Sequence, residues 1–301
     1  MTNVDQFESV FRSADKPVFH FERVRLDKVL VVSDLATQAA EGFTRAVRKF
    51  LHNLDGRPGG KPGGKPDGKP GGKQVQWETF DGSEFSSQGE LLEKVERVGP
   101  QLVCSYRNLH SDGWRWPHSL GEYLDVLTQV SDAPVLVCPH PEENAPDDFS
   151  ERGTDRVMAV TDHLAGDDRL VSWAVEITED DGHLMLTHVE DQAAYDRMIE
   201  VIGKIPALDT DTARDTIKPQ LLKEPHDYIT SCRERLEQAG ARVTVHEVVT
   251  MGHRLGDYKR LVTEHDVDVL VLNTRDDDQL AMHGLAYPLA VELRDLPLLL
   301  L

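Results

Sequence analysis

The chain has 301 residues, 39% of them hydrophobic, which is enough for one large domain or two ordinary ones. Its 53 acidic and 33 basic residues give a net charge of −20, which excludes a general affinity for nucleic acid or anionic membranes. Three cysteines are too few for a disulfide framework, and no apolar run approaches the roughly 20 residues that span a bilayer. The first residues lack the basic and apolar segments of a secretory signal, so we expect an acidic, cytoplasmic protein.

The chain begins with an N-terminal extension, residues 1–27, which is mixed and polar and contains four phenylalanines. We expect this extension to cover an edge of the fold. Residues 28–34 read Lys-Val-Leu-Val-Val-Ser-Asp, which predicts a buried strand that ends at Asp34. Residues 36–51 carry apolar side chains at helical spacing and end in basic residues, which suits the C-terminus of a helix.

Residues 56–73 repeat the sequence Gly-Lys-Pro-Gly with small variations and contain no apolar residue. Collagen would need glycine at every third position, so this four-residue repeat is typical of a disordered linker instead. The evenly spaced cations of the repeat offer a second interpretation, in which they meet an acidic partner or the acidic surface of this protein.

The first half continues with alternating strands and helices. We expect strands at residues 74–80, 99–107 and 133–138, and helices at residues 88–98 and 120–127. Residues 28–140 therefore form a first unit that contains the Gly-Lys-Pro linker.

Residues 141–154 are rich in Pro, Glu and Asp and are predicted to link the first unit to a second unit, residues 155–301. Pro206 and Pro219 are expected to interrupt the long helical stretch that ends at Gln238. We expect strands at residues 156–162, 183–190, 242–249, 266–272 and 298–301, and helices at residues 167–176, 217–238, 256–265 and 282–293.

The last part of each unit is an internal repeat, which indicates a duplicated unit. In both copies a glycine, Gly121 or Gly284, opens a helix, and a proline, Pro134 or Pro297, precedes the final strand. Alternating strands and helices indicate an α/β fold with two doubly wound parallel-sheet units. The first unit is predicted to be trimmed by one strand, with the Gly-Lys-Pro linker in the place of the second strand and the long helix.

The order of these elements resembles the universal stress protein family. The matching features are a strand ending in Asp, a strand ending in His188-Val189-Glu190, a strand ending in Glu247-Val248-Val249, and the final Pro-Leu-Leu-Leu. The resemblance covers residues 156–301 fairly completely and residues 28–138 more weakly. It implies a tandem member with the adenine-nucleotide alpha-hydrolase-like fold, a stress-response role, and ATP or AMP as the cofactor in question.

The resemblance also implies candidate nucleotide-binding residues at the ligand edge of each unit. The family has an Asp after the first strand, near the adenosine, although such an Asp can also cap the next helix. A glycine at the start of a helix suits phosphate, and arginines near the edge suit an anion. On this basis the candidates are Asp34, Asp162, Arg107, Gly121, Arg275 and Gly284.

Both units of this sequence depart from the ATP-binding motif of the family. Neither unit has the Gly-x-x-Gly after the fourth strand, and Glu122 and Leu285 stand where the motif has a hydroxyl residue. Residues 276–278 are three aspartates where a triphosphate would lie, and like charges repel. We therefore expect a degenerate nucleotide pocket.

A speculative metal site is the remaining candidate, because open parallel sheets bind ligands beyond the carboxyl ends of their strands. Its ligands would be borderline and soft groups that suit zinc. They are Cys104, His110, His118, Cys138 and His140. The alternative is that these cysteines are small core residues.

Taken together, these features predict a universal stress protein-like binding or sensing module without ordinary ATP binding, and not an enzyme. The first alternative is an adenine-nucleotide switch, and the second is a metal-dependent or ATP-hydrolysing enzyme. The expected partners are another protein or the protein itself, through a pseudo-dimer of the two units or a homodimer, with no nucleic acid and no membrane.

Overall fold

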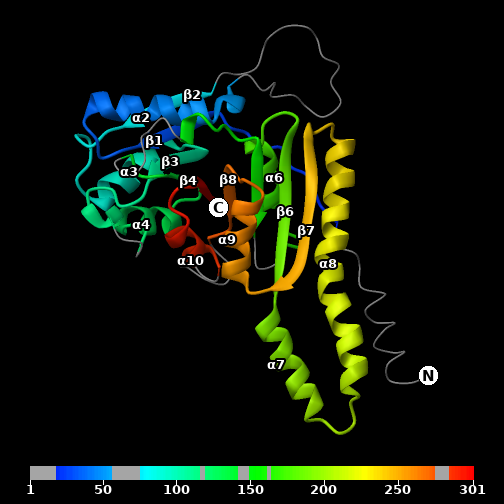
Figure 1. Cartoon of the computed structure of the whole chain (residues 1–301). Coiled ribbons are helices and arrows are strands. Elements are labelled where there is room, and N and C mark those ends of the chain that lie inside the picture. Colours follow the sequence, from blue (N-terminus) through cyan, green and yellow to red (C-terminus); the bar gives the residue numbers. More distant parts are fainter. Residues whose placement is uncertain (1–17, 56–74, 116–118, 142–148, 161–163, 275–284) are drawn as a thin grey trace.

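The structure is a computed structural model that describes residues 18–55, 75–115, 119–141, 149–160, 164–274 and 285–301. Its strands lie in one sheet, in the order β2-β1-β3-β4-β9-β8-β5-β6-β7 (Figure 1). In the first half they are β1 (Lys28–Val32), β2 (Gln76–Phe80), β3 (Leu102–Tyr106) and β4 (Val135–Cys138). In the second half they are β5 (Arg156–Val160), β6 (Gly182–Asp191), β7 (Val243–Gly252), β8 (Val269–Leu272) and β9 (Leu298–Leu300).

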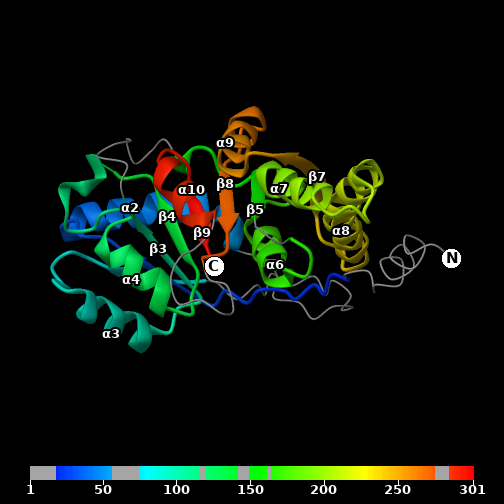
Figure 2. The ribbon, with the colours of Figure 1, turned by 90° about the horizontal axis from the view of Figure 1, so that it is seen from below.

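Helices cover both faces of this sheet, as expected for a doubly wound α/β fold (Figures 1 and 2). In the first half they are α2 (Thr37–Phe50), α3 (Gln88–Val98) and α4 (Glu122–Val130), with short 3-10 turns η1 (His52–Leu54) and η2 (Asp112–Arg115). In the second half they are α6 (Asp168–Ile177), α7 (Gln192–Gly203), α8 (Thr210–Gln238), α9 (Arg254–Glu264) and α10 (Ala286–Glu292). No helix of the described ranges is long and apolar enough to cross a membrane.

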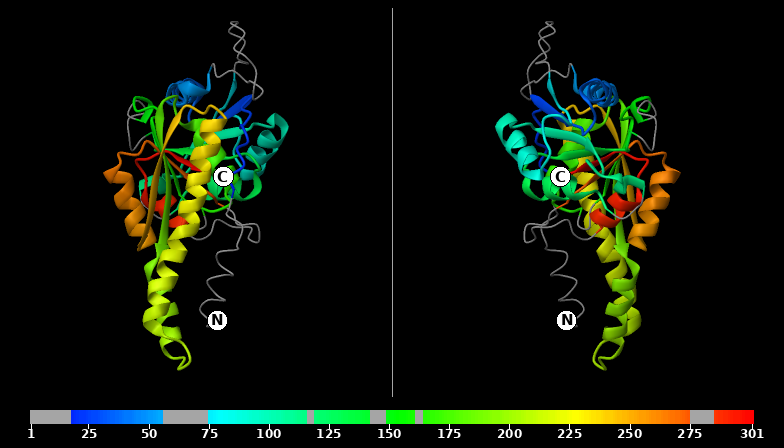
Figure 3. Two further views of the ribbon diagram at one scale, coloured as in Figure 1. Left: turned by 90° about the vertical axis from the view of Figure 1, so that its right-hand side faces the viewer. Right: turned by 90° about the vertical axis from the view of Figure 1, so that its left-hand side faces the viewer.

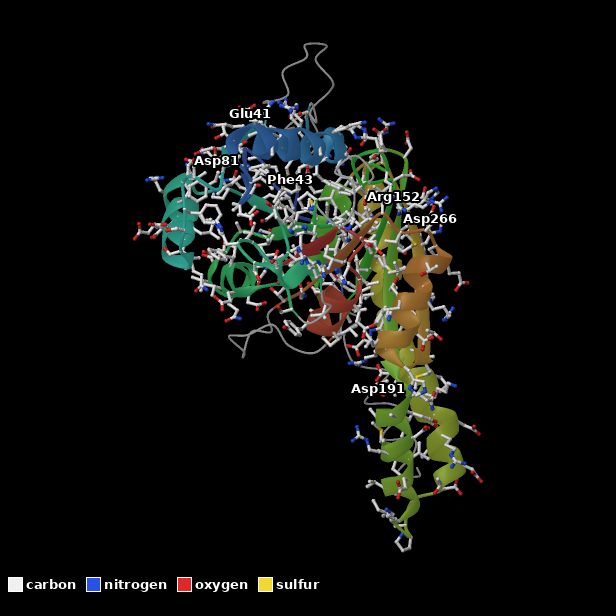
Figure 4. All side chains as sticks on the ribbon, turned by 60° about the vertical axis from the view of Figure 1, so that its left-hand side comes forward. Glu41, Phe43, Asp81, Arg152, Asp191 and Asp266 are labelled. Carbon is white, nitrogen blue, oxygen red and sulfur yellow. The ribbon has the colours of Figure 1, made fainter. Side chains whose placement is uncertain are left out.

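The helices bury the faces that their sequences make apolar. In α2, Phe43 points toward the sheet while Glu41 points outward (Figure 4), and Phe43 meets the ring of Tyr106 edge-on at 5.0 Å. The strands β1, β3 and β4 are almost entirely buried, which explains their continuous apolar sequences. The fold class that the sequence predicts, α/β with parallel strands between helices, is confirmed.

The sheet divides into two parallel sets of strands that meet in its middle. In the described residues β1 to β4 form the first set and β5 to β9 the second, so the first has one strand fewer, as predicted. The two sets join where β4 pairs with β9, the antiparallel pair of the sheet, with Leu136 opposite Leu299. β2 lies directly beside β1, which is the place that β6 takes beside β5, so the prediction that the linker replaces the second strand is wrong. In the described residues, the strand without a counterpart in the first set is β7, which pairs with β6 at the edge of the sheet.

One prediction within the second half is wrong: Pro219 does not interrupt the helical stretch. Helix α8 runs from Thr210 to Gln238 and contains both Pro219 and Pro225. A proline inside a helix removes one hydrogen bond and costs about 3 kcal/mol. Burial of the C-terminal half of α8 against the sheet, through Tyr228 and other side chains, offsets that cost.

The helix α7 and the first half of α8 form an arm that extends away from the sheet (Figures 1 and 3). The arm begins at Asp191, whose carboxylate caps α7 by accepting from the backbone N–H of Ala193 at 2.8 Å. Large apolar side chains are exposed along it: Met198, Val201, Ile205 and Leu208.

Candidate functional site

From the strand order we expect the ligand crevice of the first unit at the carboxyl ends of β1 and β3. Chain order reverses between these two strands, because β1 leads to β2 on one side and β3 leads to β4 on the other. Open α/β sheets bind ligands at such a switch point. Asp34 follows β1 and Tyr106 ends β3, so both lie at this crevice.

The carboxylate of Asp34 is held by groups of the protein on both of its oxygens. The hydroxyl of Tyr106 donates to Oδ1, and the backbone N–H of His110 donates to Oδ2 at 2.6 Å. The phenolic oxygen also accepts from the N–H of Asp34 at 3.2 Å and lies 3.0 Å from the hydroxyl of Ser33. Burial, and then the bond to Asp34, raise the pKa of Tyr106, so its hydroxyl stays protonated and remains a donor.

The loop after β3 reaches Asp34 because two of its residues adopt left-handed backbone conformations. Asn108 has φ 61° and His110 has φ 56°, and the N–H of Asn108 donates to the carbonyl of Leu120 at 2.7 Å. Gly121 packs against this loop with φ 92°, and a Cβ there would lie 2.7 Å from the Cα of Asn108. The helix-opening glycine therefore serves the close approach of two backbone segments in this structure.

Arg107 lies between the two halves of the chain. Its side chain is 2% exposed, and its guanidinium donates to the carbonyls of Ala290 and Leu293, each at 3.0 Å. These carbonyls belong to the C-terminal end of α10, where a helix leaves acceptors without intrahelical partners. The arginine that the sequence suggests for anion binding thus joins the two sets of strands.

His140, which follows β4, packs behind Tyr106. The two ring centroids are 5.1 Å apart in an edge-to-face arrangement, and His140 is buried. Burial lowers the pKa of His140 to about 4, helped by Arg107 and Arg294 and opposed by Asp34. The imidazole is therefore neutral at pH 7 and adds no positive charge to the crevice.

Four of the five speculative zinc ligands lie within the described residues, and the zinc site stays a prediction. The described residues contain no group of three or more His, Cys, Asp or Glu side chains that could hold a metal ion. Cys104 and Cys138 are fully buried on their strands, and burial raises the pKa of both thiols. The ring of His110 packs between Phe85 and Tyr123, with centroids at 4.8 and 5.2 Å. His118 lies outside the described residues.

Three of the candidates in the second unit, Asp162, Arg275 and Gly284, lie outside the described residues. At the corresponding edge, Asp167 caps α6 by accepting from the N–H of Leu170 at 3.1 Å. The side-chain amide of Asn273, which follows β8, donates to the other oxygen of Asp167. In both units, then, a carboxylate after the first strand is bound by a residue from the strand across the switch point.

Tyr106, Asp167 and Asn273 are not among the candidate residues predicted from the sequence. A usable signal existed for Tyr106, because a tyrosine in a buried strand needs a partner for its hydroxyl, and Asp34 ends another strand of the same sheet. The pairing of Asp167 with Asn273 joins residues that are far apart in the sequence and have no such signal.

Two hollows lie on the surface of the described residues, and the first is lined by Leu35, the residue after Asp34. One of about 450 Å³ follows α2 and is lined by Leu35, Gly42, Phe43 and Lys49, among others. The other, of about 530 Å³, lies between α7 and α8 near Tyr195 and Arg214.

The chain matches no family model and no curated protein. Among solved structures it is similar to a functionally unknown protein from Pseudomonas aeruginosa PAO1, with 14% identity, a TM-score of 0.49 and coverage of 92% of each chain. It is also similar to a putative universal stress protein from Pseudomonas aeruginosa UCBPP-PA14, with 12% identity, a TM-score of 0.47 and coverage of 92% and 93%. A third similar structure is a universal stress protein from Archaeoglobus fulgidus, with 13% identity, a TM-score of 0.48 and coverage of 92% and 98%. Because the identities are low and the TM-scores are below 0.5, we base the function proposed below on contacts within this chain.

Proposed function

We propose that this protein is a stress-response binding or sensing module whose first unit does not bind ATP in the ordinary way. The observation that carries the proposal is that both carboxylate oxygens of Asp34 accept hydrogen bonds from the protein. An ionised carboxylate has about four acceptor sites, and the protein uses one on each oxygen, so a nucleoside that took either of these two sites would displace the Tyr106 hydroxyl or the His110 N–H. Each such bond to a charged group is worth about 1.5–3 kcal/mol, so this displacement would weaken binding by one to two orders of magnitude.

The charges around the crevice also argue against a polyphosphate. Arg107 is directed to the carbonyls of α10, and His140 is neutral at pH 7. Glu122 stands at the start of α4, where an anion would meet the helix N-terminus. The sequence has three further aspartates at residues 276–278, after β8 of the second unit. Each of these features disfavours a triphosphate.

With ATP binding set aside, the proposed activity is recognition of a protein partner or of a second copy of the chain. A net charge of −20 disfavours anionic partners, so nucleic acid and anionic membranes are not the partners we propose. The alternative is an adenine-nucleotide switch, in which ATP or AMP displaces the contacts of Asp34.

A direct test is the nucleotide content of the freshly purified protein after denaturation, measured by chromatography. We expect far less than one adenine nucleotide per chain. An amount close to one per chain would contradict the proposal and favour the nucleotide switch. Light scattering on the same sample would show whether the chain associates with itself.

A further inference from the structure

Two histidines lie together on the outer part of the sheet, far in sequence from the Asp34 crevice. His183 is on β6 and His246 is on β7, the last strand of the sheet. The parallel register places Met185 beside His246, so His183, two residues before Met185, points to the same face as His246. His246 is exposed and His183 is half-buried.

The two imidazoles approach each other through ring nitrogens. Nδ1 of His183 is 2.9 Å from Nε2 of His246, and the ring centroids are 5.0 Å apart with a tilt of 46°. With ligand distances of about 2.0–2.1 Å, two nitrogens at 90° around a metal are about 2.9 Å apart, whereas a tetrahedral angle separates them by about 3.4 Å. This separation is that of a hydrogen bond between the two rings, and in the tautomers that leave both nitrogens unprotonated it also matches neighbouring positions around a square-planar or tetragonal metal.

We propose that His183 and His246 form a two-imidazole chelate for a divalent cation of tetragonal preference, Cu²⁺ or Ni²⁺. Imidazole suits both metals, and the order of affinities places Cu²⁺ highest. This inference does not depend on the function proposed above.

The surroundings set limits on this site. The described residues contain no group of three His, Cys, Asp or Glu side chains that could hold a metal, so water would fill the other positions. Arg233 and His265 act electrostatically on His246, and the charge of Arg233 opposes a cation. The strands are already paired over their length, so the cation would bind a formed surface and would not be needed for folding.

The test uses the full chain with Cu²⁺ below one equivalent, observed by electron paramagnetic resonance, and calorimetric titrations with Ni²⁺ and Zn²⁺. We expect hyperfine splitting from two imidazole nitrogens, and tighter binding of Ni²⁺ than of Zn²⁺. Losing one of two linked ligands forfeits their effective concentration, so His183→Gln and His246→Gln should each raise the apparent Kd for Ni²⁺ about tenfold or more.

His226→Gln is the matched control, because it removes another exposed histidine of the same half, which is bound to Glu247 at 2.6 Å. This variant should bind Ni²⁺ like the unaltered protein. Unchanged Ni²⁺ binding in both chelate variants would overturn the proposal, and so would a copper spectrum of the unaltered protein with one nitrogen or none. A copper spectrum with fewer than two nitrogens overturns the proposal even if a variant fails to fold.

Discussion

The hydroxyl of Tyr106 donates its hydrogen bond to the carboxylate of Asp34 and thereby joins the end of β3 to the chain after β1. The bond crosses the switch point of the first unit, where an open α/β sheet would hold a ligand. The N–H of His110 completes the arrangement on the second oxygen of Asp34. A residue that is expected near a nucleoside is therefore part of an internal network.

Replacing Tyr106 with phenylalanine tests the strength of this network. Tyr106→Phe keeps the ring packed on Phe43 but removes the donor to Asp34, so we expect a loss of about 1–3 kcal/mol in the free energy of unfolding by urea. Tyr123→Phe is the control, since its hydroxyl bonds an exposed carbonyl, that of Ser86, at 3.0 Å. The control should cost less than about 1 kcal/mol. Equal costs for the two variants would show that the Asp34 bond has no special weight.

Gly121 should tolerate no side chain, because the new Cβ would meet the backbone of Asn108 at 2.7 Å and φ is 92°. We expect Gly121→Ala to lower the free energy of unfolding by more than about 2 kcal/mol. Gly99 is a matched comparison, with φ 57° and no atom within 4 Å of the added Cβ, so Gly99→Ala should cost about 1 kcal/mol. Similar values for both variants would contradict the close approach at Gly121.

Arg107 should be needed as arginine, not only as a cation. Lysine carries its donors on a single nitrogen and lacks the planar fork whose two nitrogens reach the carbonyls of Ala290 and Leu293, so Arg107→Lys should lower the free energy of unfolding by about 2 kcal/mol or more. Arg115→Lys, at an exposed residue, should change it by less than about 0.5 kcal/mol. If Arg107→Lys left the free energy of unfolding unchanged, the contact with α10 would contribute little to joining the two halves.

Two buried groups should make stability depend on pH in opposite directions. The pKa of His140 is about 4 in the folded protein, against an ordinary 6.5. Between pH 6.5 and 4, His140 therefore binds a proton in the unfolded chain but not in the folded protein. The contribution of neutral His140 to the free energy of unfolding is complete above pH 6.5, and about 2–3 kcal/mol of it is lost as the pH falls toward 4. Burial raises the pKa of Asp268 to about 6 from 3.8, so its contribution is present at low pH and is lost as the pH rises through 6.

Single variants separate the two effects in urea unfolding curves between pH 4 and 7. His140→Gln should remove the loss on acidification, which leaves a protein whose stability falls as the pH rises. Asp268→Asn should remove the opposite trend and steepen the acid loss. A pH profile that neither variant changes would contradict the environments that the structure gives these groups.

Much of the fold could be predicted from the sequence, because its strands and helices have clear patterns. The helix over residues 88–98 matches α3, with Ser87 as its cap and Gly99 in the left-handed position after it. Buried strands such as β3 and β8 read as short apolar runs, as both faces of the sheet are covered. The interruption predicted at Pro219 was wrong, because local sequence does not reveal the packing that maintains α8 through this proline.

The candidate site was less predictable, because it depends on contacts between distant residues. Asp34 was identified by its position after a strand, but its partners Tyr106 and His110 come from a loop that reaches it only after β1 and β3 pair. Arg107 could be recognised as a cation near the crevice. Its hydrogen bond to α10 could not, because it depends on the β4–β9 pairing that joins the two halves. Side-chain direction at the crevice therefore had to come from the structure.

The central claim, that internal bonds hold Asp34 and leave no ordinary ATP site in the first unit, is tested most directly by calorimetry. ATP, ADP and AMP would be titrated into the full chain with and without magnesium, beside the Asp34→Ala variant. We predict no detectable binding at millimolar nucleotide for the unaltered protein. Micromolar binding of ATP that is lost in Asp34→Ala would contradict the account and establish a nucleotide switch.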